Sequence, residues 1–405
     1  MRVLRPRSEI TALKRAYVLG GVADSTLLPF IPLYLLQRGM GPAAIGLVLA
    51  ASALAAVAGG LVWAYLADRH VRPERLLVFA TIAAAAAAML MDPLTGPGVG
   101  GAVIVVLSIA RSPLTLLDPI TLRKLRVTIR TDYARIRLRM SAGWAVGVIV
   151  SGAVYESLGL RLMPFLYAPL SLLFGLWVWR TIRSEPEALT GETAVSTGAR
   201  PSLHLAAVPV AMAWFLTSCL CLGVSLAATQ NFLTLQISDL GGGALLVGAA
   251  AAFQGLTEIP TMGYTHVLTR YFTHRALFAI GCAIYLVIFV AWAFVSSAFL
   301  AALLKLAVGV AFALTYVAAV VIVNELTPAR LRATGQALMK SVLFGVAPIA
   351  GALGGGVVYG ALGARVMFLA ATVVVAAAGL IAVVAVPSRQ SAAGEPALAA
   401  NPATP

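Results

Sequence analysis

Long runs of apolar residues, separated by short polar or charged segments, cover most of the 405-residue chain. A helix that crosses a bilayer needs about 20 consecutive residues that are mostly apolar, and runs of this kind recur along the whole chain. The pattern therefore predicts an all-α membrane protein with twelve transmembrane helices. The expected spans are residues 15–37, 43–66, 74–92, 99–123, 133–157, 161–181, 205–232, 243–265, 275–296, 298–324, 331–358 and 363–387.

Two similar octapeptides recur six predicted helices apart. Residues 152–159 read Gly-Ala-Val-Tyr-Glu-Ser-Leu-Gly, and residues 356–363 read Gly-Val-Val-Tyr-Gly-Ala-Leu-Gly. Both copies run the same way through the membrane, which favours two parallel six-helix bundles related as pseudo-repeats. The expected division is a first bundle at 1–183, a polar cytoplasmic linker at 184–203, a second bundle at 204–387 and a disordered cytoplasmic tail at 388–405.

The charge distribution indicates a membrane partner. The chain is 60% hydrophobic and 11% charged, which excludes an ordinary soluble domain. Its net charge of +14 would suit a nucleic-acid-binding protein. Lys and Arg instead gather in every second loop, as the positive-inside rule requires. We therefore expect a monomeric, multi-pass protein of the plasma (inner) membrane with both termini cytoplasmic, the lipid bilayer as a partner and no nucleic acid.

Five ionisable residues lie inside predicted spans that are otherwise apolar: Asp24, Arg111, Glu258, Lys305 and Lys340. A charge near the bilayer centre costs about 3 kcal/mol or more, so it rarely faces lipid. Such residues indicate a watery pathway and therefore a transporter of a small-molecule substrate.

These charges also suggest pairs and a proton carrier. Asp24 with Arg111 is the expected pair of the first half, and Glu258 with Lys340 or Lys305 that of the second. Fixed ion pairs without a transport role are the alternative, although buried pairs add little net stability. No histidine lies in mid-membrane. The expected proton carrier is therefore a carboxylate whose neutral form is favoured by desolvation, first Glu258 and then Asp24.

Two further sets of residues complete the expected site. The solute cavity is expected to contain Asp118, Trp144, Gln230, Asn231, Gln254 and Tyr316. Helix–helix contacts are the alternative role for the polar residues of the seventh span. The gate at the inner mouth is expected to contain Asp68, Arg69, Arg135, Arg137, Arg139, Arg330 and Arg332. Asp118 lies closer to the cytoplasmic end than the other cavity residues and is also a candidate for the gate.

Several motifs resemble those of the major facilitator superfamily. They are Leu28-Pro-Phe-Ile-Pro-Leu-Tyr34, Leu66-Ala-Asp68-Arg69, Tyr133-Ala-Arg135-Ile-Arg137-Leu-Arg139-Met-Ser141-Ala-Gly143-Trp144, Glu258-Ile-Pro260 and Pro328-Ala-Arg330-Leu-Arg332-Ala-Thr334-Gly335-Gln336. Within the superfamily the chain is most similar to the branch of 3-phenylpropionate-transporter-like proteins and nucleoside:proton symporters, related to lactose permease. One departure is that Val308 precedes Gly309, where the branch often has His, and Lys305 stands a turn earlier.

The resemblance implies a secondary active transporter that works by alternating access, with a proton gradient in place of a cofactor. Proton-coupled symport of a small organic solute is our first hypothesis. A proton-antiport efflux pump for drugs or metabolites is the alternative within the class, and a non-transporting membrane sensor the alternative outside it. The chain lacks the HExxH, GxSxG and phosphate-loop motifs, so we expect neither an enzyme nor a metal site.

Overall fold

The regular structure of the described chain is entirely helical. The computed structural model describes residues 6–91, 96–111, 116–118, 120–121, 133–182, 209–328 and 331–386. The expected linker and tail lie outside these residues. The helices are α1 (Pro6–Ser25), η1 (Leu28–Phe30), α2 (Ile31–Gln37), α3 (Pro42–Arg69), α4 (Pro73–Met89), α5 (Pro97–Arg111), α7 (Tyr133–Leu158), η3 (Leu160–Leu162), α8 (Met163–Thr181), α9 (Val210–Asp239), α10 (Ala244–Leu268), α11 (His274–Phe294), α12 (Ala298–Leu303), α13 (Lys305–Leu326), α14 (Arg332–Ser341), η6 (Val342–Val346) and α15 (Ala347–Ala385).

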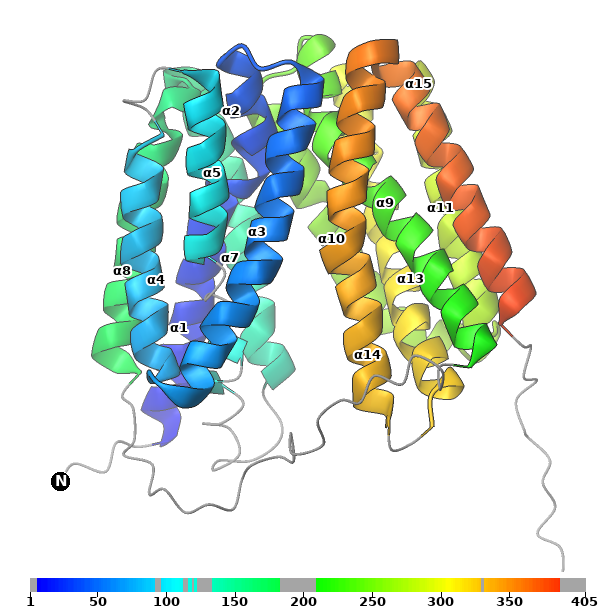
Figure 1. The fold of residues 1–405 in the computed structure, drawn as a ribbon, viewed down its shortest axis with the longest axis horizontal. Helices are drawn as coiled ribbons and strands as arrows, with labels where there is room; N and C mark the ends of the chain where they lie inside the picture. The colour runs from blue at the N-terminus through cyan, green and yellow to red at the C-terminus, as the bar shows by residue number, and fades with distance from the viewer. Residues whose placement is uncertain are drawn as a thin grey trace, which may run out of the picture.

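Eight segments of the described residues are long and apolar enough to cross a membrane. They are Ile10–Gln37, Pro42–Arg69, Ile136–Leu158, Leu160–Thr181, Val210–Asp239, His274–Phe294, Ala298–Leu326 and Arg332–Val384. The last segment runs through α14, η6 and α15 and reverses direction at Gly363. The backbone of Gly363 has a φ of 83°, a value that glycine adopts readily. Figure 1 shows the two legs of α15 meeting at this corner. The full count of twelve spans stays a prediction.

Local sequence signals set the starts of several helices. Pro42 and Pro73 stand in the first turns of α3 and α4, where a missing N–H leaves no hydrogen bond unmade. Thr273 caps α11 by accepting a hydrogen bond from the amide of Ala276, and Ser297 caps α12 in the same way. Gly243, at the start of α10, has no side chain with which to do this.

The first span is broken, which the prediction of a continuous helix at 15–37 did not include. α1 ends at Ser25 and the chain passes through η1 before α2 begins. Pro29 lies in η1 and Pro32 in the first turn of α2, and neither can donate a backbone hydrogen bond. The hydroxyl of Tyr155 on α7 donates to the free carbonyl of Thr26 at 2.7 Å, which satisfies the backbone at the break. The break brings Leu28 and Pro29 into the wall of a cavity between the N-terminal and C-terminal helices, which is described below.

The helices form two groups that lie side by side (Figure 1). In the first group α1 packs on α7 and α8, and α4 on α8; in the second, α15 packs on α9 and α11, and α10 on α13. The groups touch where α7 meets α10 and where α3 meets α15. We call them the N group, α1 to α8, and the C group, α9 to α15.

Glycines allow backbone-to-backbone contact between the two groups. A Cβ added at Gly46 would lie 2.4 Å from the carbonyl oxygen of Ala352, and one at Gly248 would lie 2.4 Å from that of Val148. Such contacts need residues without side chains, as in other helix interfaces in membranes. They lie toward the end of the molecule that carries the corner at Gly363, which we call the joined end. The helix α1 begins at the opposite end, which we call the N-terminal end (Figure 1).

Candidate solute site

A cavity of about 930 Å³ lies between the N and C groups. Its walls come from η1, α2 and α7 on one side and from α9, α10 and α13 on the other. This volume is within the range of small-molecule sites in proteins. Most of the lining is apolar, and the polar side chains are few: Ser141, Gln230, Asn231, Thr234, Gln254, Glu258 and Lys305.

Lys305 is the buried cation of this cavity, with 6% of the residue exposed. Its ammonium donates to the side-chain oxygen of Gln254 at 2.8 Å and to that of Gln230. The amide nitrogen of Gln230 also donates to the Gln254 oxygen, at 3.1 Å. Two neutral carboxamides from α10 and α9 thus replace part of the water that a buried ammonium loses, because their oxygens are hydrogen-bond acceptors.

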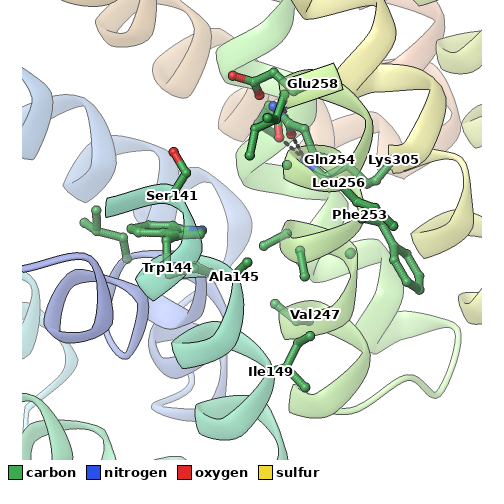
Figure 2. Close-up of a pocket in the computed structure, with 18 of the residues that line it drawn as sticks. Ser141, Trp144, Ala145, Ile149, Val247, Phe253, Gln254, Leu256, Glu258 and Lys305 are labelled. Carbon is green, nitrogen blue, oxygen red and sulfur yellow. Dashed lines mark hydrogen bonds between the residues drawn. The ribbon is translucent and has the colours of Figure 1, made fainter. Parts of the chain in front are cut away.

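Glu258 lies one turn along α10 from Gln254 and is half-buried. Figure 2 shows its carboxylate beside the cluster of Gln254 and Lys305, facing the same cavity. The carboxylate and the ammonium of Lys305 interact electrostatically. Of the two cations that the sequence offered for Glu258, Lys305 is therefore the neighbour. Lys340 is exposed on α14, outside the lining of both cavities described here, and its role stays a prediction.

Gly309 explains why Lys305 can reach α10. A Cβ at Gly309 would lie 2.2 Å from the carbonyl oxygen of Gln254 and 2.3 Å from the hydroxyl of Thr257. Thr257 in turn donates to the carbonyl of Leu306 at 2.6 Å. The helices α10 and α13 are therefore in direct contact one turn from Lys305.

The opposite wall of the cavity comes from α7. Ser141 and Trp144 face the Gln254 side across the cavity (Figure 2). Glycines again set this position, because a Cβ at Gly143 would lie 2.5 Å from the carbonyl oxygen of Val18 on α1. One wall therefore offers an indole ring and a hydroxyl, and the other offers carboxamides and two opposite charges.

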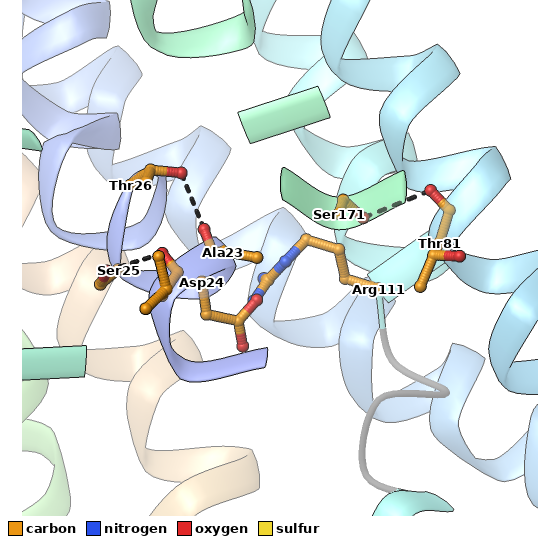
Figure 3. Close-up of polar contacts among 8 residues, drawn as sticks. Ala23, Asp24, Ser25, Thr26, Thr81, Arg111 and Ser171 are labelled. Carbon is orange, nitrogen blue, oxygen red and sulfur yellow. Dashed lines mark hydrogen bonds and ion pairs between the residues drawn. The ribbon is translucent and has the colours of Figure 1, made fainter. Parts of the chain in front are cut away.

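A second cavity, of about 530 Å³, lies within the N group and contains the ion pair of Asp24 and Arg111. The Arg111 nitrogen is 2.7 Å from the Asp24 oxygen, and the side chains are 14% and 10% exposed. Figure 3 shows this pair beside the end of α1, where the hydroxyl of Thr26 donates to the carbonyl of Ala23 at 2.7 Å. The pair expected from the sequence is thus present.

Asp118 lines the same second cavity. It accepts a hydrogen bond from the hydroxyl of Tyr17 at 2.7 Å and forms an ion pair with Arg137. The sequence offered Asp118 both for the solute cavity and for the gate, and in the structure it pairs with Arg137, a gate candidate. Tyr17 was missed, although it lies seven residues before Asp24 and therefore on the same face of α1. Asn231 lines both cavities, which makes them neighbours.

The remaining candidates lie elsewhere. Tyr316 stacks on Phe312 with ring centroids 5.6 Å apart and does not line either cavity. Asp68 and Arg69 are exposed at the end of α3, with the Arg69 guanidinium 5.2 Å from the ring of Tyr65. The gate candidates Arg139 and Arg332 are also exposed. The side chain of Arg135 and the whole of Arg330 lie outside the described part of the chain.

Buried charges that face a cavity between two groups of membrane-length helices define a multi-pass membrane transporter. The chain belongs to the MFS_1 like family, whose sequence model matches residues 10–370. This confirms the resemblance to the major facilitator superfamily, and because the family and its structural neighbours are transporters, the protein is not an enzyme. No curated protein sequence matches the chain.

Solved structures show the same fold. The nucleoside transporter NupG aligns with a TM-score of 0.82 and 18% identity, over 93% of this chain and 98% of that one. A bacterial homolog of the human lysosomal transporter Spinster, in an inward-facing and unoccupied conformation, aligns with a TM-score of 0.67 and 16% identity, over 95% and 98%. The POT family transporter PepTSo aligns with a TM-score of 0.69 and 11% identity, over 94% and 97%.

Proposed function

We propose that the protein is a proton-coupled symporter of a small organic solute that works by alternating access. The observation that carries the proposal is the cluster of Lys305, its two carboxamides and Glu258 in a cavity shared by both groups of helices. A fixed structural pair would be expected to lie away from a space large enough for a solute, whereas all four of these C-group side chains line the cavity. Here the charges lie where solute and proton can affect one another.

The coupling step follows from the charges. While Glu258 is ionised, it attracts the ammonium of Lys305 and holds the cluster together. A proton on Glu258 removes that attraction, so Lys305 and its carboxamides become available to the polar groups of a solute. Trp144, on the opposite wall, contributes an aromatic surface on which an apolar part of the solute packs. Once both are bound, polar groups of the solute replace the Glu258 carboxylate as partners of Lys305, and the two groups of helices can rock around the occupied site.

The same proposal includes the topology. We place the joined end outside the cell and the N-terminal end in the cytoplasm, since the Lys- and Arg-rich loops belong to the latter. The protein is then a monomer in the plasma membrane with twelve spans. These spans form two parallel six-helix bundles, at 1–183 and 204–387. Closure at the joined end corresponds to a conformation that faces inward.

Proton movement in liposomes tests the proposal. The purified protein is reconstituted with a pH-sensitive dye in the lumen, and nucleosides, aromatic acids and sugars are added outside. Nucleosides come first because the neighbour NupG is a nucleoside transporter. A symporter acidifies the lumen when its solute is added. Alkalinisation would show a proton-antiport efflux pump instead, and no proton movement with any solute class would favour a sensor.

Glu258→Gln is the matched variant for this assay. It keeps the size of the side chain and one acceptor oxygen, and it removes the ability to carry a proton. Solute-dependent acidification should disappear, while exchange of labelled solute across the membrane continues. A Glu258→Gln variant that acidifies the lumen as well as the parent would refute the assignment of the proton to this carboxylate.

A further inference from the structure

The joined end contains a contact between a side chain of the N group and the start of a helix in the C group. Glu156 is on the last turn of α7, and its carboxylate oxygen accepts a hydrogen bond from the amide of Leu245 at 3.2 Å. Leu245 is the second residue of α10. The contact is about three turns along α7 from Trp144, and Leu245 is more than three turns along α10 from Glu258, so the contact is separate from the coupling step.

The beginning of α10 depends on this contact. The first amides of any helix have no partner within the helix and need an acceptor from elsewhere. For α11 and α12 this acceptor is local, because Thr273 and Ser297 cap the helices that follow them. The residue in the same position before α10 is Gly243, which has no side chain and makes no such bond. The acceptor for α10 therefore comes from the other group.

The carboxylate of Glu156 occupies the space that a side chain at position 243 would need. A Cβ built on Gly243 would lie 1.9 Å and 2.2 Å from the two carboxylate oxygens of Glu156. Backbone contacts continue along the same interface, since a Cβ at Gly152 would lie 2.9 Å from the carbonyl oxygen of Ala244. A negative charge in this place is also favoured by the partial positive charge at a helix N-terminus.

We propose that Glu156 is a latch that holds the joined end closed by capping α10 from the opposite group. When the groups separate at this end, α10 loses its cap and cannot replace it from Gly243. The latch thus biases the protein toward the conformation closed at this end. It is distant from the charged cluster, so its test is independent of the solute that the protein carries.

Spin labels on the two groups measure the latch directly. Labels at Leu90, at the end of α4, and Leu362, at the corner of α15, are exposed and lie away from Glu156. Pulsed electron–electron distance measurements on the full chain in lipid nanodiscs, with the three native cysteines replaced, give the populations closed and open at this end. Glu156→Ala should raise the open-to-closed ratio roughly fivefold, which is what a helix cap of ordinary strength contributes.

Gly243→Asn is a second variant that acts from the other side. Its side chain gives α10 a cap of its own and takes the space of the carboxylate, and the extended backbone at this position accepts asparagine. It should also raise the open-to-closed ratio. The double variant with Glu156→Ala should shift the ratio no further than the larger single change, because both remove the same contact.

Two controls separate a latch from a general loss of structure. Glu156→Gln keeps an acceptor oxygen but no charge and should give an intermediate ratio. Ser157→Ala removes a neighbouring hydroxyl that bonds only within α7, to Ala153 and Val154 in the described chain, and should leave the ratio unchanged. Parent-like distance distributions in both Glu156→Ala and Gly243→Asn would overturn the proposal, as would an equal shift in Ser157→Ala.

Discussion

Replacing Gly309 by alanine should both destabilise the protein and impair the solute site. The added Cβ would lie 2.2 Å from the carbonyl oxygen of Gln254, whereas ordinary contact begins at 3.4 Å. The helices α10 and α13 must therefore separate by about 1.2 Å at this point. Forcing a methyl group into a close-packed interface typically costs about 1–3 kcal/mol of unfolding free energy.

The same displacement acts on Lys305, which is one turn away on α13. Its hydrogen bond to Gln254 is 2.8 Å long, and a lengthening of about 1 Å takes it beyond bonding distance. The ammonium then loses one of its carboxamide acceptors while it remains buried. We therefore expect transport per folded molecule to fall roughly tenfold or more, the factor that about 1.4 kcal/mol represents.

Gly354→Ala is the matched control. Its Cβ would meet nothing within 4 Å, and the residue lies within α15 on an exposed face of the helix. This substitution should stabilise the protein by about 0.5–1 kcal/mol, since alanine loses less conformational entropy in a helix than glycine. Thermal unfolding of the purified proteins is followed by a thiol-reactive dye, to which Cys219 and Cys282 are buried until the fold opens. The two substitutions should shift the midpoint in opposite directions. Equal midpoints and equal transport for Gly309→Ala and the parent would refute the reasoning.

Three further outcomes are expected. Glu258→Gln should abolish uphill accumulation of solute while exchange continues, measured with labelled solute in liposomes with and without a pH gradient; accumulation with unchanged pH dependence would contradict it. Asp24→Asn and Arg111→Gln should each lower the free energy of unfolding by about 3 kcal/mol, because the remaining partner is a buried charge without its counterion. The double variant should recover much of this loss, and strictly additive losses would contradict the pairing. A cysteine at Leu158 should react with an impermeant reagent from outside the cell and one at Tyr271 only after permeabilisation, and the reverse pattern would invert the proposed orientation.

Hydropathy alone predicted most of the helical segments, because a bilayer leaves little freedom in where an apolar helix of about 20 residues begins and ends. It missed the break after Ser25. Pro29 and Pro32 were visible in the sequence, but a proline near mid-span does not say whether the helix kinks or stops. The hydroxyl of Tyr155, which satisfies the broken backbone, comes from a helix more than a hundred residues later.

The site was predictable in its residue types more than in its contacts. Asp24 and Arg111 could be paired because both are ionisable, lie in one half and fall at similar depth. The choice between Lys305 and Lys340 could not be made, since it depends on the rotation of each helix about its axis. That rotation is fixed by contacts such as Gly309 on Gln254, whose partners belong to different helices.

Trp144 gives the protein a built-in optical reporter. The chain has six tryptophans, and of these Trp144 lines the cavity between the two groups of helices. Trp292 is fully buried in the C group, while Trp179 and Trp214 are largely exposed on the outer surface of the described chain. Indole emission shifts with the polarity of its surroundings, so a solute that replaces water beside Trp144 changes the fluorescence of that ring. An unlabelled library of metabolites can therefore be screened by emission spectra alone, with Trp144→Phe as the silent reference.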